Sequence, residues 1–266
     1  MKKNSYSILL ILLFSVKLLA QSDVSQARWQ SAKVITDGSN NEWRKPLNLY
    51  DAITGLLFTI ANDSTNLYLC FTNNDERKVT KLMKAGWSIE IYSKEKNKKF
   101  DATIVFPAVQ MISDPGKDEG VTKTERADFK NETALYRLNV QTVKTTGFVT
   151  SNGDIPVVSS NGINIGIGAD STQEIIFELA VPLKELMAKN NIQLNEEMAL
   201  NITVNKLKRP AYRGDPDGKD LVGKGRGRNG RSEAARENAV YTTDRSLLFT
   251  EINFRQKFML ANRQAK

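Results

Sequence analysis

The sequence predicts an all-β fold: a two-sheet antiparallel β-sandwich with one or two short helices and a long flexible Gly/Arg-rich loop. Three observations support this prediction. Several segments alternate apolar and polar side chains with a period of two, which is typical of strands with one buried face. Turn residues separate these segments, and only two short stretches have a helical pattern. Many strands with few helices favour two stacked sheets over an α/β fold.

The first twenty residues have the composition of a secretory signal peptide. Lys2 and Lys3 precede an apolar run over residues 8–16, and Leu18-Leu19-Ala20 then ends in a small residue. Lys17 interrupts the run, which is shorter than the roughly 20 residues needed to span a bilayer. We therefore expect cleavage of residues 1–20, export through the secretory pathway to the periplasm or beyond, and no membrane span. Residues 21–266 are expected to form a single β-sandwich domain.

The expected strands share a pattern in which large apolar side chains recur at every second position. They cover residues 66–71, 87–92, 100–106, 163–167, 175–181, 200–204 and 246–254. Short helices are expected over residues 78–84 and directly after Pro182, because proline is tolerated in the first turn of a helix.

Residues 211–238 are expected to form a flexible basic loop, because they are rich in Gly, Arg and Lys and poor in apolar side chains. The formal charge of the chain is +8, and the stretch from Lys206 to Arg231 contributes nine basic and three acidic residues. A dedicated nucleic-acid binder usually spreads its charge over a folded surface, so no nucleic-acid partner is expected. The loop could contact anionic glycans or the envelope surface, or it could be a solvated segment that aids solubility.

The residue inventory excludes several kinds of chemistry. The chain has no histidine, which removes Ser-His-Asp and Cys-His catalysis, imidazole zinc sites and histidine-ligated haem. Cys70 is the only cysteine, so no internal disulfide can form, and we expect this residue to be buried in a strand. Catalysis by two carboxylates stays open.

A series of short motifs carries a family resemblance. Asp37-Gly38 and Glu42-Trp43 form the pattern D-G-x-x-x-E-W, and they are followed by Asn62-Asp63, Asn66-Leu67-Tyr68-Leu69 and Gly86-Trp87-Ser88-Ile89-Glu90-Ile91. Over residues 34–207 this series resembles family 9 carbohydrate-binding modules and their sandwich relatives in secreted bacterial proteins. The resemblance implies sugar binding through aromatic rings stacked on sugar faces, with polar groups bonding the hydroxyls. Independently, Asp37-Gly38 suits a tight turn, and Trp43 suits a core position.

The candidate ligand-binding residues are Trp87, Glu90, Tyr92 and Tyr212. Trp87 shares a strand face with Ile89 and Ile91, so a core position competes with ligand contact. Tyr92 shares the opposite face with Glu90, and Tyr212 begins the basic segment.

Related sandwiches often hold a structural calcium ion, which takes several oxygen ligands from loops. By this resemblance, the candidate calcium ligands are Asp63, Asn74, Asp75 and Glu76. The competing interpretation is that these residues form solvated turns that cap strands.

The sequence therefore predicts an exported, non-catalytic protein that binds a poly- or oligosaccharide. An envelope assembly protein, whose sheet edges and basic loop contact other proteins, is the first alternative. A glycoside hydrolase using two carboxylates such as Glu90 and Glu178 is the second. Both carboxylates alternate along strands like solvent-facing residues, which disfavours the hydrolase. Haem binding would need a methionine ligand.

Overall fold

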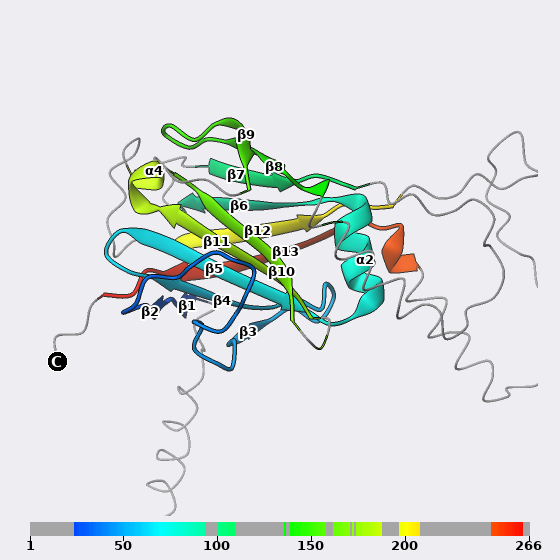
Figure 1. Cartoon of the computed structure of the whole chain (residues 1–266), viewed down its shortest axis with the longest axis horizontal. Helices are drawn as coiled ribbons and strands as arrows, with labels where there is room; N and C mark the ends of the chain where they lie inside the picture. The colour runs from blue at the N-terminus through cyan, green and yellow to red at the C-terminus, as the bar shows by residue number, and fades with distance from the viewer. Residues whose placement is uncertain are drawn as a thin grey trace, which may run out of the picture.

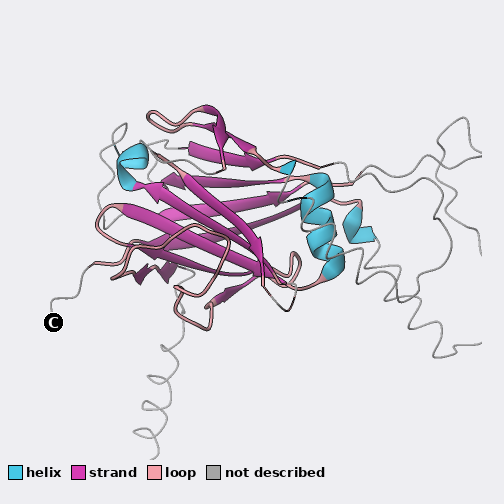
Figure 2. Cartoon of the chain, viewed as in Figure 1, coloured by secondary structure: helices cyan, strands magenta, loops and turns pink. Residues whose placement is uncertain are grey.

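The structure, a computed structural model, is a sandwich of two β-sheets (Figures 1 and 2). It describes residues 24–93, 101–109, 136, 139–157, 162–170, 172, 174–187, 197–207 and 246–262. The all-β sandwich that the sequence predicts is confirmed. The expected signal peptide (1–20) and the expected basic loop (211–238) lie outside the described residues.

The first sheet, called the seven-stranded sheet below, has the strand order β1-β13-β12-β6-β7-β8-β9. Its strands are β1 (Val24–Gln26), β6 (Trp87–Ser93), β7 (Asp101–Phe106), β8 (Thr142–Thr146), β9 (Gly153–Pro156), β12 (Met198–Val204) and β13 (Ile252–Met259). Neighbouring strands are antiparallel except β1 and β13, which are parallel.

The second sheet, called the six-stranded sheet, has the order β10-β11-β5-β4-β2, and β3 also pairs with β4. Its strands are β2 (Arg28–Trp29), β3 (Leu49–Tyr50), β4 (Leu57–Asn62), β5 (Asn66–Asn73), β10 (Asn164–Ala169) and β11 (Ile175–Pro182). Strands β2 and β4 are parallel. The prediction of purely antiparallel sheets is therefore wrong at two places. At both places, a short strand from the N-terminal part of the described chain adds to the edge of a sheet in parallel, β1 beside β13 and β2 beside β4.

Two helices lie at opposite ends of the sandwich, α2 (Glu76–Ala85) and α4 (Leu183–Met187) (Figure 1). Both were expected from the sequence. The last strand differs from the expectation at its start. Residues 246–248 are helical, and β13 begins only at Ile252. The expected strand start at residue 246 is therefore wrong.

Aromatic side chains from both sheets meet in the core. Trp87 of β6 stacks on Phe106 of β7, with ring centroids 4.4 Å apart and planes inclined by 9°. It also meets Phe177 of β11 edge-on at 5.0 Å, which joins the seven-stranded sheet to the six-stranded sheet. Pairs of this kind add about 0.5–1.5 kcal/mol beyond the burial of their area.

A buried lysine connects helix α2 to the chain segment that leads into β13. The Lys81 side chain is buried, and its Nζ donates hydrogen bonds to the carbonyl oxygens of Leu247 and Thr250, each at 2.6 Å. Burial lowers the pKa of Lys81 to about 8. The two bonds require the carbonyls of residues 247 and 250 to point at one atom, which suits a helical turn rather than the extended strand expected there.

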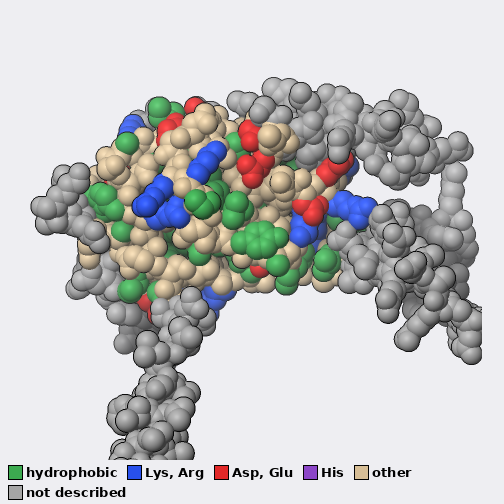
Figure 3. Space-filling view, turned by 90° about the horizontal axis from the view of Figure 1, so that it is seen from below, with side chains coloured by type: hydrophobic (Ala, Val, Ile, Leu, Met, Phe, Trp, Pro, Cys, Tyr) green, Lys and Arg blue, Asp and Glu red, His purple; other side chains and the backbone are tan. Residues whose placement is uncertain are grey.

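No helix within the described ranges is long and apolar enough to cross a membrane. One surface of the molecule shows lysine and arginine side chains interspersed with acidic and apolar ones (Figure 3). This surface therefore has no extended field of a single sign among the residues drawn in colour.

Candidate functional site

The outward side chains of the seven-stranded sheet are mainly polar, and most of them are half-buried or exposed. Along β6, alternation buries Trp87, Ile89 and Ile91 and leaves the intervening side chains half-buried at the opposite surface. We call this surface the open face, and define it by Ser88, Glu90, Tyr92, Thr103, Asn201, Thr203, Asn253 and Arg255.

Strand register places four polar side chains in one row across the open face. Asn201 of β12 pairs with Arg255 of β13 on one side and with Glu90 of β6 on the other. Glu90 in turn pairs with Thr103 of β7. Neighbouring strands lie about 4.8 Å apart, so the row extends over roughly 14 Å. The row runs perpendicular to the strands, so it brings together residues that are far apart in the sequence.

Two contacts fix the orientation of side chains in and beside this row. Asn201 donates from Nδ2 to Oε2 of Glu90 at 2.7 Å. The Arg255 guanidinium lies over the Tyr92 ring, 5.0 Å from its centroid, which is within the range of a cation–π interaction. The open face therefore presents the Glu90 carboxylate as a hydrogen-bond acceptor and the Arg255 guanidinium as a donor of several hydrogen bonds. The Asn201 amide can both donate and accept, and Tyr92 supplies one aromatic ring.

The structure brings together two of the four ligand-binding candidates. Glu90 and Tyr92 lie on the open face, as their shared strand face predicted. Trp87 is fully buried between Phe106 and Phe177, so its ring has no surface to offer a ligand; the core position that competed with ligand contact is the observed one. Tyr212 lies outside the described residues. Asn201 and Arg255 were missed, since only the register of β12 and β13 brings them beside Glu90 and Tyr92.

The four calcium candidates lie at the two ends of strand β5. Asp63 is in the turn before the strand, and Asn74, Asp75 and Glu76 follow its last residue. An eight-residue strand spans about 23 Å, so one ion cannot take ligands from both ends. The structure therefore does not bring the four candidates together at one point. Within the described residues, no group of three or more His, Cys, Asp or Glu side chains is placed to hold a metal ion.

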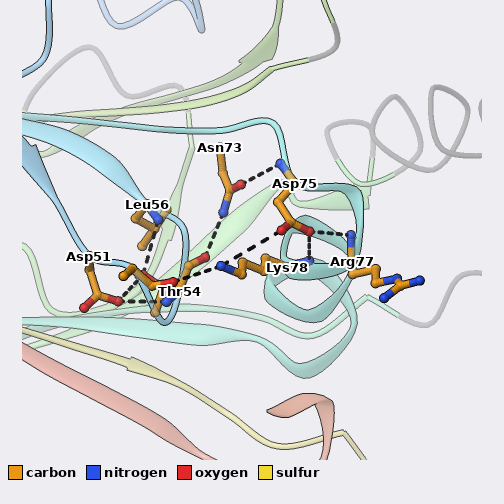
Figure 4. Close-up of polar contacts among 8 residues, drawn as sticks. Asp51, Thr54, Leu56, Asn73, Asp75, Arg77 and Lys78 are labelled. Carbon is orange, nitrogen blue, oxygen red and sulfur yellow. Dashed lines mark hydrogen bonds and ion pairs between the residues drawn. The ribbon is translucent and has the colours of Figure 1, made fainter. Parts of the chain in front are cut away.

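Each of the two aspartates already accepts hydrogen bonds from its own turn. Oδ1 of Asp63 accepts from the backbone N–H groups of Thr65 and Asn66, and Oδ2 accepts from the Tyr68 hydroxyl at 2.7 Å. Asp75 is the N-cap of helix α2 and accepts from the N–H groups of Arg77 and Lys78 (Figure 4). These are the turn and capping roles that aspartate commonly fills. The calcium prediction itself stays untested.

The outward surface of the six-stranded sheet is covered by residues 34–47, which we call the cover loop (Figure 1, blue). Apolar side chains of the loop and of the sheet form a second buried cluster, separate from the core between the sheets: Val34, Trp43 and Leu47 with Ala61, Tyr68, Cys70, Ile176 and Ala180. Cys70 is thus buried in a strand, as expected, and burial raises the pKa of its thiol.

A buried carboxylate ties the cover loop to the sheet. Glu178 of β11 accepts a hydrogen bond at Oε2 from the backbone N–H of Gly38, at 2.7 Å. Its Oε1 accepts from Nε1 of Trp43, at 2.6 Å. Burial raises the pKa of Glu178 to about 7; the charges of Glu42 and Asp37 act in the same direction, and the two hydrogen bonds oppose them. The Trp43 indole N–H therefore has the partner that its core position required.

Glycines let the loop approach the sheet closely. Gly38 has a φ of +83°, and a side chain at Gly168 of β10 would lie 2.0 Å from the carbonyl oxygen of Gly38. A side chain at Gly166 would lie 2.7 Å from the nitrogen of Gly38. The alternating glycines of β10 therefore form the surface on which the Asp37-Gly38 turn rests.

Glu90 and Glu178 point away from the core on different sheets. Stacked sheets lie about 10 Å apart, so two carboxyls on their opposite outer surfaces are farther apart than the roughly 5–9.5 Å that glycosidases use. The expectation that Glu178 faces solvent is also wrong, because the cover loop buries it completely. These two carboxylates cannot act as an acid–base pair in this fold.

Comparison with family models, with curated proteins and with solved structures gave no match to the chain. The fold thus defines the protein as a β-sandwich, and its function has to be inferred from the geometry of its faces.

Proposed function

We propose that the chain is an exported, non-catalytic protein that binds a poly- or oligosaccharide on the open face. The observation that supports this most is the polar row across the central strands, with the ring of Tyr92 beside it. The row consists of accessible side chains on regular strands, which hold polar groups at fixed spacings.

The chemistry of the open face matches the chemistry of a sugar. Each sugar hydroxyl both donates and accepts hydrogen bonds. Glu90 offers acceptors, Arg255 offers donors, and Asn201 offers both. The Tyr92 ring supplies an apolar surface for the C–H face of a sugar ring. Because the row extends over roughly 14 Å of a sheet surface, it suits an extended glycan chain better than a single small sugar.

Affinity electrophoresis of the full chain against a panel of plant and microbial polysaccharides tests the proposal. We expect slower migration in at least one polysaccharide gel. Tyr92→Ala should weaken this binding by about 1 kcal/mol, or roughly fivefold, through loss of the ring contact. Tyr50→Ala is the matched control, since Tyr50 is 64% exposed on β3 of the other sheet. Uniform migration across the panel would instead favour the envelope assembly alternative.

The remaining parts of the proposal need separate measurements. N-terminal sequencing of the protein secreted by its host should start at Gln21 if residues 1–20 are a signal peptide. Incubation with the retained polysaccharide should release no reducing sugar. Sustained release that Glu90→Gln abolishes would contradict the non-catalytic part and leave binding intact.

A further inference from the structure

A hollow of about 440 Å³ opens on the six-stranded sheet beside the cover loop. Leu57 of β4 and Thr72 of β5 lie side by side in register at its base. Glu174, directly before β11, lines it on the other side of β5, and Lys45 of the cover loop also lines it. The hollow is therefore separate from the open face, which belongs to the other sheet. Its volume is in the range that holds small ligands.

The Thr72 side chain carries a buried hydroxyl without a partner among the described residues. Thr72 is 1% exposed, and its Oγ1 makes no hydrogen bond. Along β5 it follows Tyr68 and Cys70 on the outward surface, so it belongs to the side of the strand where the hollow lies. A buried polar group left unsatisfied costs about 1–3 kcal/mol, and a bound molecule in the hollow would remove that cost.

The hollow also has one side chain of each charge. The Lys45 ammonium donates to Oδ1 of Asn40 at 2.8 Å, which leaves further N–H donors on the same nitrogen. Among the described residues, no ion pair joins the Glu174 carboxylate to Lys45. The hollow is therefore lined by one cation and one anion that do not pair with each other.

The rest of the lining is the Asn40 amide and the aliphatic side chains of Pro46, Leu47 and Leu57, and no aromatic ring of the described residues lines the hollow. A sugar would find no ring on which to stack. A small zwitterion with an aliphatic side chain would complement both charges and the apolar surface.

We propose that this hollow binds a free α-amino acid with an apolar side chain. The ligand carboxylate accepts from Lys45 and from the Thr72 hydroxyl. The ligand ammonium donates to Glu174, and the side chain covers Leu47 and Leu57. Each of the two charges of the ligand then meets an opposite charge, and the buried hydroxyl gains a partner. The proposal does not depend on glycan binding, because the two sites use different sheets.

Isothermal titration of the full chain with L-leucine tests this site directly. Isocaproate, which lacks the ammonium, and isoamylamine, which lacks the carboxylate, should each bind at least roughly tenfold more weakly, since each leaves one charged side chain unmatched. Glucose tests the saccharide alternative. Binding of glucose equal to that of L-leucine, or no heat with L-leucine at about 10 mM, would overturn the proposal and leave the hollow filled by water alone.

Substitutions within the hollow then locate the site. Lys45→Met and Glu174→Gln should each weaken L-leucine binding roughly tenfold. Thr72→Val keeps the shape and removes the unpartnered hydroxyl, so it should weaken binding while the ligand-free protein becomes more stable to unfolding. Tyr92→Ala on the open face is the control and should leave L-leucine binding unchanged. Unchanged binding in Lys45→Met would contradict the assignment even if L-leucine binds elsewhere.

Discussion

The two outward surfaces of the sandwich differ in what lies over them. On the six-stranded sheet, the central outward side chains are mainly apolar, include the buried Glu178, and are covered by residues 34–47. On the seven-stranded sheet, the corresponding positions carry mainly polar side chains, most of which are half-buried or exposed. Burial of apolar area is worth about 25 cal/mol per Å², so a covered surface contributes stability. An uncovered polar surface is left available for recognition.

Two glutamates show that one residue type can have opposite roles in one fold. Glu90 and Glu178 both lie on central strands and both point away from the core. Glu90 is half-buried and accepts a hydrogen bond from a neighbouring amide, whereas Glu178 is fully buried and holds a loop. What lies above the strand decides the role, and strand periodicity does not report it.

Trp43→Ala, on the covered surface, should cause the largest loss of unfolding free energy among the variants compared. Removing a buried tryptophan costs about 3–5 kcal/mol through lost burial and a cavity, and it also leaves Oε1 of Glu178 without its donor. Tyr50→Ala, at an exposed aromatic, should cost about 0.5 kcal/mol or less. Urea unfolding of both variants measures the comparison. Equal losses would mean that the cover loop does not stabilise the fold.

The pH dependence of the unfolding free energy should report the raised pKa of Glu178. Its pKa is raised from 4.5 to about 7 in the fold by burial, so the folded chain keeps a proton that the unfolded chain has released. Stability should therefore fall as pH rises from about 4.5 to about 7 and level off above that, by an amount on the order of 3 kcal/mol. Glu178→Gln removes the titrating group, so the difference in unfolding free energy between wild type and variant should change across this window. A constant difference would contradict the raised pKa.

Calcium should have the smallest effect on stability. The carboxylates of Asp63 and Asp75 are already engaged by backbone N–H groups, and they lie at opposite ends of β5. We expect the melting temperature in calcium and in chelator to agree within about 1 °C, which corresponds to a few tenths of a kcal/mol. A rise of several degrees with calcium would restore the calcium prediction, with ligands other than the proposed four acting together.

The sequence predicted strands in which large apolar side chains recur at every second position. Residues 66–71 and 87–92 show this recurrence, and they became parts of β5 and β6. Strand β4 was missed, because Leu57–Asn62 is buried almost throughout and lacks alternation. The helical turn at residues 246–248 was taken for strand, since its contacts with Lys81 join segments far apart in the chain.

The candidate site was predictable only in part. The shared face of Glu90 and Tyr92 follows from strand periodicity alone. Their neighbours Asn201 and Arg255 depend on the pairing of β6, β12 and β13, which periodicity does not give. The hollow was missed for the same reason, because Lys45 of the cover loop, Thr72 of β5 and Glu174, directly before β11, meet only in the fold.

We propose that the open face binds glycan, while the surface under the cover loop stabilises the fold. Amide chemical-shift mapping tests it most directly, with the full nitrogen-labelled chain titrated with an oligosaccharide of the polysaccharide that it retains. We expect the amide signals of β6, β12 and β13 around Glu90, Tyr92, Asn201 and Arg255 to shift, and Tyr92→Ala to reduce these shifts. Shifts confined to the cover loop and β11, or none at saturating ligand, would contradict it.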